Sequence, residues 1–135
     1  MNERKFFPKN ERLSRQKDID RLFASGQSFV TYPLRIVYLH DNEASSPGIS
    51  ILVSVSKKKI RQAVKRNRIK RLIRESFRLN KSEIVTFLKR KKRKLHIALL
   101  YLGKDLTRYV KIEKAVQKAL KHMEASPLPP LIAGE

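Results

Sequence analysis

Short apolar runs along the chain predict three long β-strands and one further edge strand. Residues 33–40 (PLRIVYLH) and 48–55 (GISILVSV) are rich in branched and aromatic side chains, which favours strands. The turn-rich segment between them predicts that these two runs pair as a hairpin. Residues 95–102 (LHIALLYL) form the most continuous apolar run, which is typical of a central strand. Phe29 and Val30 favour a short additional strand at an edge.

Apolar residues at helical spacing predict three amphipathic helices around these strands. The first spans about 15–24 and ends before Gly26, a residue typical of helix ends. A short helix lies within 80–94, and the last helix runs from about 107 to 124. Because the first helix has an apolar side to bury, we expect it to pack against the sheet that follows it.

A fourth helix lies in the stretch 57–77, KKKIRQAVKRNRIKRLIRESF, where ten residues are Lys or Arg and only Glu75 is acidic. At 100° per residue, Ile69, Ile73 and Phe77 gather on one side of this helix. The opposite side carries Asn67, Lys70, Arg71, Arg74 and Arg78. The pattern predicts a helix that is anchored in the core and has a cationic outer face.

The start of this basic helix is indicated by two apolar residues that do not fit its buried side. Ile60 and Val64 project opposite to the apolar stripe, so a continuous helix would have to bury two opposite faces in succession. We therefore expect residues 57–62 to form a loop and the helix to begin near Ala63. The unpaired N–H groups of its first turn would favour phosphate.

The order of these elements predicts an α+β fold, with helices packed on one small mixed sheet. The connection from residue 55 to residue 95 through the basic helix is long enough to join parallel neighbours. Residues 1–124 are expected to form a single domain, in which residues 1–13 are a basic extended arm. The Pro-rich segment 125–135 is expected to be a disordered tail.

The composition of the chain, above all its net charge, indicates which kind of molecule it binds. The 135 residues carry a formal net charge of +20, and such self-repulsion makes a polyanionic partner the leading expectation. Nucleic acid comes first and an anionic membrane surface second. No apolar run approaches the roughly 18 residues that span a bilayer, and the N-terminus has no apolar signal core, so we expect no membrane-spanning segment, no export and a cytoplasmic location. There is no cysteine, which excludes disulfides and thiolate metal sites.

No catalytic constellation is visible in the sequence. His40, His96 and His122 have no nearby pairing pattern, and His96 in the central strand is more typical of a satisfied structural residue than of a general base. The acidic residues are scattered without paired carboxylates, and there is no Gly-rich phosphate loop. If the protein takes part in a reaction, we expect the reacting groups to belong to another molecule.

The basic helix carries the chemistry that can be assigned. Arg66 and Arg68 have guanidinium groups that bind phosphate in a bidentate manner, which Lys cannot do. Asn67 both donates and accepts hydrogen bonds, so it suits a phosphate contact or a hydrated metal, although an exposed helix residue without a role explains it equally well. The run KRKKRK at 89–94 fits a solvated linker and a phosphate contact about equally.

The string KRNRIKRLIRESFR (65–78), preceded by SVSKKKIRQAV, resembles the signature of the protein subunit of bacterial ribonuclease P. The core of that signature is R-N-R, here Arg66, Asn67 and Arg68. The resemblance extends to FPKNERLSRQKDIDRLFASG at 7–26 and to GISILVSVSKK before the basic helix.

The resemblance implies an α-β-β-β-α-β-α order with a left-handed crossover around the R-N-R helix. It also implies one protein bound to a large catalytic RNA, in a holoenzyme that is an endoribonuclease. This enzyme removes the 5′ leader of precursor tRNA by hydrolysing one phosphodiester. The active site and its Mg²⁺ ions belong mainly to the RNA, so no catalytic residue is expected in this chain, and no metal ligand is assigned.

The resemblance assigns two groups of site residues. Those expected to face the catalytic RNA and the cleavage region are Lys57, Lys58, Arg66, Asn67, Arg68, Lys70, Arg71 and Arg74. The leader is expected in a cleft between the first helix and the sheet, near Ile19, Phe23 and Val37. Family members often have Phe in place of Ile19 and sometimes Tyr in place of Val37, so the details of leader stacking stay open.

Other classes explain part of the pattern. A non-enzymatic RNA-binding module, such as a ribosomal or assembly protein, accounts for the charge, the helix and the lack of catalytic groups equally well. Only the R-N-R string and its flanks distinguish the two readings. A protein-only nuclease would need a carboxylate cluster. A helix that binds a membrane surface would need a free apolar side. The apolar side of the basic helix is expected to be buried in the core, so we expect no membrane partner.

Overall fold

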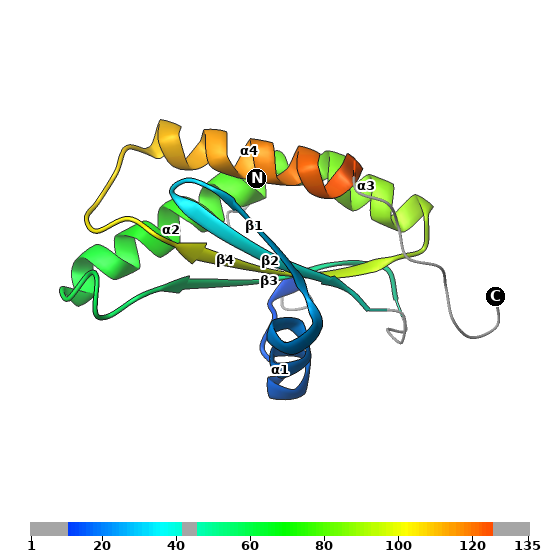
Figure 1. Ribbon diagram of the computed structural model, residues 1–135. Coiled ribbons are helices and arrows are strands. Elements are labelled where there is room, and N and C mark those ends of the chain that lie inside the picture. Colours follow the sequence, from blue (N-terminus) through cyan, green and yellow to red (C-terminus); the bar gives the residue numbers. More distant parts are fainter. Residues whose placement is uncertain (1–10, 42–45, 126–135) are drawn as a thin grey trace, which may run out of the picture.

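The computed structural model describes residues 11–41 and 46–125 of the chain. Four helices and four strands follow one another (Figure 1). Their order is α1 (Gln16–Ser25), β1 (Gln27–Thr31), β2 (Leu34–His40), β3 (Gly48–Val55), α2 (Ala63–Asn80), α3 (Ser82–Arg90), β4 (Lys94–Tyr101) and α4 (Tyr109–Ala125). The predicted α+β class and order of elements are confirmed, and the short helix expected within 80–94 is α3.

The four strands form one mixed sheet in the order β1-β2-β4-β3. The hairpin predicted between residues 33–40 and 48–55 is wrong, because β4 lies between β2 and β3. It pairs antiparallel with β2 and parallel with β3. The physical reason is burial: five consecutive residues of β4, Leu95–Leu99, are buried, and only a central strand covers both of its faces.

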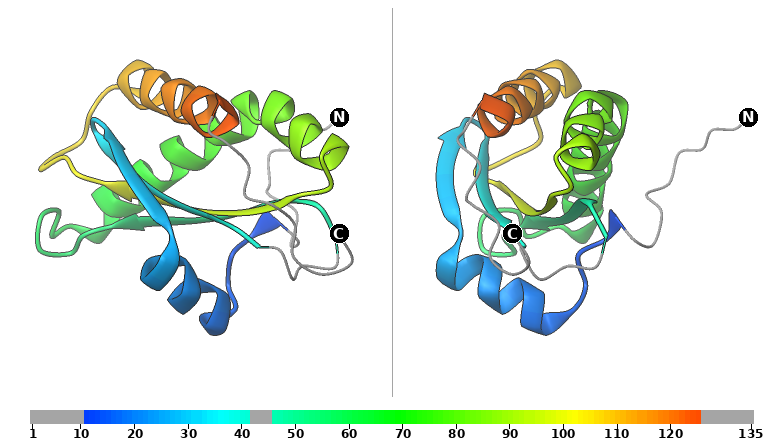
Figure 2. Two further views of the ribbon diagram at one scale, coloured as in Figure 1. Left: turned by 45° about the vertical axis from the view of Figure 1, so that its right-hand side comes forward. Right: turned by 90° about the vertical axis from the view of Figure 1, so that its right-hand side faces the viewer.

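The connection from β3 through α2 and α3 to β4 is a crossover between parallel neighbours. In the right-hand view of Figure 2, both strands run away from the viewer, β4 lies to the left of β3, and the helices pass above. This path is left-handed, opposite to nearly all such connections. The crossover places the basic helix beside the outer edge of β3.

The helices cover the two faces of the sheet unequally. Helices α2, α3 and α4 lie over one face and α1 lies under the other (Figure 1). The larger core includes Ile36, Ile73 and Phe77, which have no exposed surface. Burying each such side chain contributes on the order of 2 kcal/mol. A smaller cluster under α1 contains Leu22 and Val37.

The basic helix begins where the sequence predicts. Residues 57–59 form a turn and α2 starts at Ala63. Ile60 is buried in the core, whereas the side chain of Val64 is 80% exposed, so the two residues indeed do not share the buried side of α2. Because Ile60 reaches the core from the loop, the loop is anchored at the N-terminal end of the helix.

Gly26 ends α1 for a reason that differs from a left-handed cap. Its φ of −73° is an extended conformation that any residue adopts. A Cβ atom at this position would lie 2.4 Å from the carbonyl oxygen of Leu22 and 2.9 Å from that of Tyr38. Glycine is required because the end of α1 approaches the backbone of β2 closely.

The segment before α1 lies along the outer edge of β3. The Leu13 N–H donates to the Ile51 carbonyl at 2.8 Å, and Arg12 forms an isolated parallel bridge with Ile51. The arm predicted over 1–13 and the tail predicted over 125–135 lie almost entirely outside the described residues. The single domain over 1–124 therefore stays a prediction for its first residues.

Candidate nucleic-acid interface

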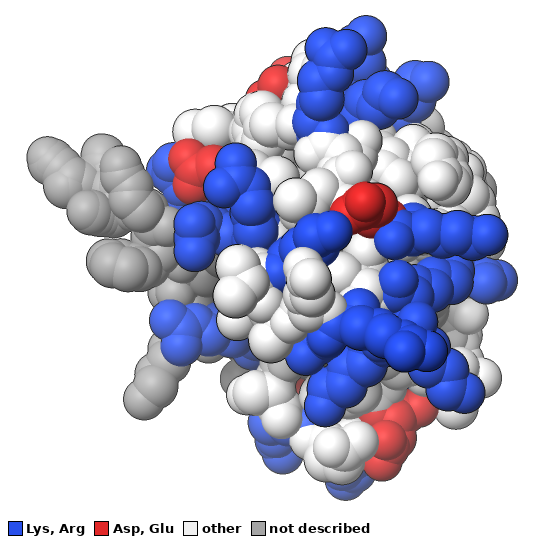
Figure 3. Space-filling model, turned by 90° about the vertical axis from the view of Figure 1, so that its left-hand side faces the viewer, with Lys and Arg blue, Asp and Glu red and all other residues white. Residues whose placement is uncertain are grey.

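The outer face of α2 is a row of cations above a buried apolar stripe. Arg68, Arg71 and Arg74 are exposed, whereas Ile69 and Ile73 beneath them are fully buried. Within residues 11–41 and 46–125, none of these three arginines has an acidic partner. Figure 3 shows that Lys and Arg gather over the end of the molecule where α2 begins. The row is therefore available to an external anion.

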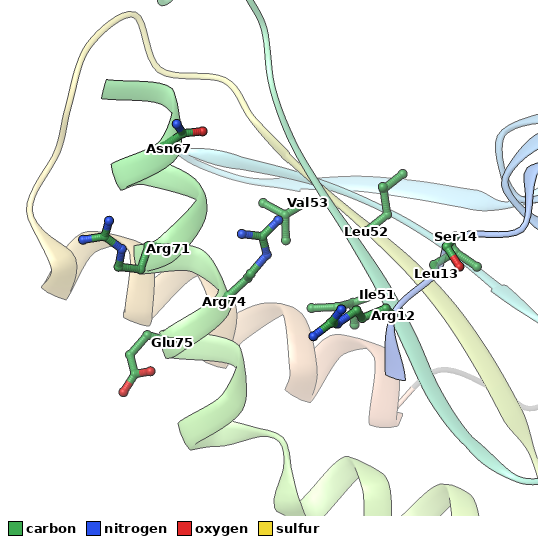
Figure 4. A pocket seen from close by; sticks show the side chains of 10 residues that line it. All are labelled: Arg12, Leu13, Ser14, Ile51, Leu52, Val53, Asn67, Arg71, Arg74 and Glu75. Atoms are coloured by element: carbon green, nitrogen blue, oxygen red, sulfur yellow. The ribbon is translucent and has the colours of Figure 1, made fainter. Parts of the chain in front are cut away.

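A groove of about 680 Å³ separates α2 from the edge of the sheet. Its lining comes from α2 (Asn67, Arg71, Arg74 and Glu75), from β3 (Ile51, Leu52 and Val53) and from the segment before α1 (Arg12, Leu13 and Ser14). Figure 4 shows Arg74 and Arg12 pointing into the space between helix and strand, whereas Arg71 points outward. The groove thus has an apolar floor and cationic walls, a combination that suits a polyanion with apolar parts.

Glu75 does not neutralise this groove. Its two carboxylate oxygens accept hydrogen bonds from Arg78, from Nη2 at 2.6 Å and from Nε at 3.2 Å. In Figure 4 its side chain turns away from the β3 wall. Because Arg78 compensates Glu75, the arginines on the groove keep their charge for a ligand.

The loop before α2 forms a second cationic surface. Lys57, Lys58, Arg61 and Arg66 line an open hollow at the N-terminal end of the helix. Nη1 of Arg66 donates to the carbonyl oxygen of Ile60 at 2.9 Å and to that of Arg61 at 2.7 Å. Oγ of Ser56 accepts a hydrogen bond from the N–H of Lys58 at 3.2 Å. These bonds hold the loop so that its lysines stand beside the first turn of α2.

The first turn of α2 is poorly stabilised by the chain itself. Its N-cap residue Gln62 makes no side-chain cap hydrogen bond, and the turn contains no acidic residue. Both features leave N–H groups and a positive dipole end without a partner. The cationic hollow and the helix start therefore attract negative charge to the same place.

The predicted RNA-facing residues fall into these two surfaces, with two exceptions. Lys57, Lys58 and Arg66 line the hollow, and Asn67, Arg71 and Arg74 line the groove. Arg68 is exposed and Lys70 is half-buried, and neither lines the groove or the hollow. What these residues bind stays a prediction.

The predicted leader residues lie where α1 packs on the sheet. Val37 is only 7% exposed, and Ile19 is half-buried against the same apolar cluster. The Phe23 side chain is 47% exposed. Of the three, Phe23 offers a free ring surface, whereas Val37 supports the packing of α1. Their role toward a leader stays a prediction.

The structure adds lining residues that were not predicted from the sequence, among them three residues of the groove and one arginine of the hollow. Arg12, Ser14 and Leu52 line the groove, and Arg61 lines the hollow. Arg61 could have been predicted from the sequence, because it lies in the same basic stretch as Lys57 and Lys58. Nothing in the sequence indicated Arg12 and Ser14, because they reach the groove only through the pairing of their segment with β3.

A buried polar cluster links α1 to the sheet. Asp18, Asp41 and His96 place possible ligand atoms within 4.8 Å of one another, the one such group in the described part of the chain. Oδ2 of Asp41 lies 2.9 Å from Nε2 of His96 and 2.9 Å from Nη2 of Arg21. The Arg21 guanidinium therefore occupies the position of a cation, and the cluster does not fit Mg²⁺, which prefers oxygen ligands and water. The contact favours a structural His96.

No helix in the described part of the chain is long and apolar enough to cross a membrane.

The model of the Ribonuclease P family matches residues 7–124. A protein of Porphyromonas gingivalis named "Ribonuclease P protein component" is 43% identical over 112 residues, which cover 83% of this chain and 82% of the relative. A protein of the same name from Chlorobium phaeobacteroides is 32% identical over 130 residues, 89% of either chain.

Solved structures share the fold. The RNase P protein of Staphylococcus aureus superposes with a TM-score of 0.64 at 27% identity, over 84% of this chain and 94% of the other. The Thermotoga maritima RNase P protein gives a TM-score of 0.66 at 21% identity, over 83% and 96% of the two chains, which supports the fold alone. With the family match over most of its length and relatives above 30% identity, this chain belongs to the ribonuclease P protein family.

Proposed function

We propose that this chain binds the catalytic RNA of a ribonuclease P holoenzyme and helps it to remove the 5′ leader of precursor tRNA. One protein is expected per RNA, in the cytoplasm. The phosphodiester is hydrolysed by groups of the RNA and its Mg²⁺ ions, and the protein contributes binding and positioning. Family membership supports the subunit role.

The observation that carries the proposal is the groove beside α2. Arg71 and Arg74 extend from a rigid, core-anchored helix and have no acidic partner within the described residues. Each phosphate they neutralise releases condensed counterions, which makes RNA binding favourable and salt-dependent. Asn67 at the same groove offers a donor and an acceptor that orient the bound backbone.

The metal is expected on the RNA. In the part of the chain that the structure describes, the one cluster of acidic and histidine side chains already holds the guanidinium of Arg21. Mg²⁺ keeps several waters and is commonly bound through phosphate oxygens, which the RNA supplies. Two RNA molecules repel each other, and the protein's cations reduce this repulsion, so less Mg²⁺ is needed for substrate binding.

The leader is expected to pass the end of α1. A single strand is held by a cationic path and by aromatic rings on which bases stack. Phe23 is the predicted leader residue with an exposed ring, while Ile19 and Val37 shape the apolar surface beside it. The apolar floor of the groove includes Leu52, which belongs to the same apolar surface as Val37. A leader on Phe23 therefore continues toward the cations of α2.

Reconstitution tests the proposal. The protein is mixed with a bacterial ribonuclease P RNA at low Mg²⁺, and cleavage of a precursor tRNA with a labelled 5′ end is followed. We expect the protein to stimulate leader removal and to have no activity without the RNA. If cleavage is unchanged while the protein still binds RNA, a non-enzymatic RNA-binding role is correct instead.

Matched variants connect this test to the groove. The pair Arg71→Ala and Arg74→Ala removes two charges from the groove, and we expect it to weaken RNA binding and to flatten its salt dependence. Lys121→Ala serves as the control, because Lys121 is exposed on α4 and lines neither the groove nor the hollow. Equal loss in the control would show a general charge effect without a site.

A further inference from the structure

A pocket of about 460 Å³ lies away from the groove, between the turn that joins β1 to β2, the loop after β4 and the start of α4. This volume is in the range of small-ligand sites. Tyr32 stands on the turn with its side chain 72% exposed, and Leu106 in the loop is 40% exposed. The pocket therefore offers an aromatic ring and an apolar wall that no other part of the described chain covers.

The floor of this pocket is held in place by the chain itself. A Cβ atom at Gly103 would lie 2.6–2.8 Å from the ring and hydroxyl of Tyr101, so the absence of a side chain at Gly103 lets the ring lie close over the backbone. The Tyr101 hydroxyl donates to the carbonyl oxygen of Asp105 at 2.6 Å. The carboxylate of Asp105 accepts from its neighbour's N–H at 2.7 Å and from Nζ of Lys65 at 3.1 Å. The pocket exists before any ligand binds.

Four lysines surround this floor. Lys111, Lys114 and Lys118 lie at helical spacing on one exposed side of α4, and Lys104 lies in the loop. None of the four has an acidic partner among the described residues. The acid that lines the pocket, Asp105, is already engaged by Lys65. The local charge is therefore strongly positive next to an exposed aromatic ring.

We propose that this pocket binds an unpaired nucleotide of RNA, whose base stacks on Tyr32 and whose phosphates contact the lysines of α4. Every base has a face that stacks on an aromatic ring, and lysines beside such a ring follow the backbone without reading sequence. A double-stranded segment would not expose a base to the ring, so the ligand is a loop, bulge or end. The inference rests on the proposed function, since it extends the RNA surface of the same protein.

The position of the pocket supports this extension. The loop after β4 is tied to the basic region by two lysines, because Lys65 of α2 pairs with Asp105 and Nζ of Lys59 lies 3.4 Å from the carbonyl oxygen of Leu102. Figure 3 looks onto the end of the molecule where α2 begins, and it shows a further group of blue side chains at the top of that face, separated from those below by uncharged atoms and one acidic group. An RNA bound along α2 thus meets further cations in the direction of the pocket.

Site-specific crosslinking tests the position directly. A photoreactive aromatic residue replaces Tyr32 in the full chain, which is bound to a bacterial ribonuclease P RNA with and without precursor tRNA. We expect crosslinks to unpaired nucleotides, and the arm in which they form identifies which RNA supplies them. The control position is Thr86, which is exposed on α3 at the other end of the molecule (Figure 1). No crosslink at Tyr32 above the Thr86 level in either arm would overturn the proposal.

Affinity measurements separate stacking from charge. Tyr32→Ala should weaken the binding of the RNA that crosslinks by about tenfold, and Tyr32→Phe should restore it, because stacking needs the ring but not the hydroxyl. The pair Lys111→Ala and Lys114→Ala should lower the salt slope by about two. Lys121→Ala, which removes one charge from the same helix outside the pocket, is the control and should leave the slope unchanged.

The outcomes distinguish this pocket from the proposed function. If the pocket variants bind RNA like the control while the Arg71→Ala and Arg74→Ala pair is impaired, the pocket proposal fails and the α2 groove stands. If the α2 pair and the pocket variants all bind as the unchanged protein does, both proposals fail. The urea midpoint of each variant should equal that of the unchanged protein, since the replaced side chains are exposed.

Discussion

Arg66 and Arg68 flank the same asparagine, yet their guanidinium groups have different surroundings. Nη1 of Arg66 donates to two backbone carbonyls of the preceding loop, at 2.9 and 2.7 Å. Arg68 is exposed and has no acidic partner in the described chain. Arg66 therefore acts partly as a positioning residue for the loop, whereas Arg68 keeps all its donors for a ligand.

Replacement of Arg68 tests the ligand role. We expect Arg68→Ala to weaken association with the catalytic RNA or to raise the Mg²⁺ needed for cleavage, with a salt slope lower by about one. Filter binding across a salt series and cleavage across a Mg²⁺ series measure both effects. The unfolding midpoint should not change, because Arg68 lies off the buried stripe. Wild-type binding together with wild-type Mg²⁺ dependence would exclude Arg68 from the interface.

His40 should make stability depend on pH. Burial, followed by the charge of Arg93, lowers the pKa of His40 below its ordinary value of 6.5. The unfolded chain therefore binds a proton at a higher pH than the folded chain does, so folding loses stability as the pH falls below about 6.5. Urea unfolding of His40→Asn between pH 7.5 and 5 should show a smaller loss than the unchanged protein. Parallel curves would show that other groups carry the pH dependence.

At the scale of elements, α2 and the loop before it act as one unit. Ile60 anchors the loop in the core, and Arg66 ties it to the helix. The loop lysines stand beside the uncapped start of α2 only while these contacts hold. In the R-N-R string, the first residue, Arg66, therefore makes structural hydrogen bonds to the loop, whereas the last residue, Arg68, is exposed on the surface.

Arg66→Lys separates geometry from charge in this unit. Lysine keeps the charge but lacks the planar guanidinium that holds Nη1 against both carbonyls, so the loop should loosen at a cost of about 1 kcal/mol. Amide hydrogen exchange of residues 58–60 should accelerate, and RNA binding should weaken although the net charge is unchanged. If exchange is unaffected, the hydrogen bonds of Arg66 do not hold the loop.

The elements themselves were largely predictable, but their pairing was not. The apolar stripe of α2 and the misplaced Ile60 and Val64 located the start of the helix correctly, because both signals are local. The supposed hairpin of β2 and β3 failed because the central place in the sheet is taken by β4. That strand begins at Lys94, 39 positions after β3 ends at Val55. The turn-rich loop between β2 and β3 does not indicate that a strand distant in sequence will pair between them.

At the scale of the whole molecule, repulsion between like charges lowers the stability of the folded state, and burial of the apolar core raises it. The 32 Lys and Arg residues give the chain a net charge of +20, and Figure 3 shows many of them over the end of the molecule where α2 begins. The core beneath must overcome the mutual repulsion of these cations. An RNA partner, or salt, removes part of this cost.

Salt should therefore stabilise the free protein. Raising NaCl from about 0.02 to 0.5 M shortens the screening length several-fold, so the thermal unfolding midpoint should rise. The same change should weaken RNA binding, because counterion release then gains less. Calorimetry of the free protein and binding titrations in matched buffers give both trends. A midpoint that falls with salt would show that attractive ion pairs outweigh the repulsion.

The sequence by itself determined the helices and strands, the start of α2, the cationic face and the family resemblance, because each depends on spacing within one segment. The tertiary structure alone decided the strand order, the groove that joins Arg12 to Arg74, and the pocket of Tyr32 beside the lysines of α4. These features bring together residues far apart in the chain, and which segments meet is set by the competition for burial in the whole fold.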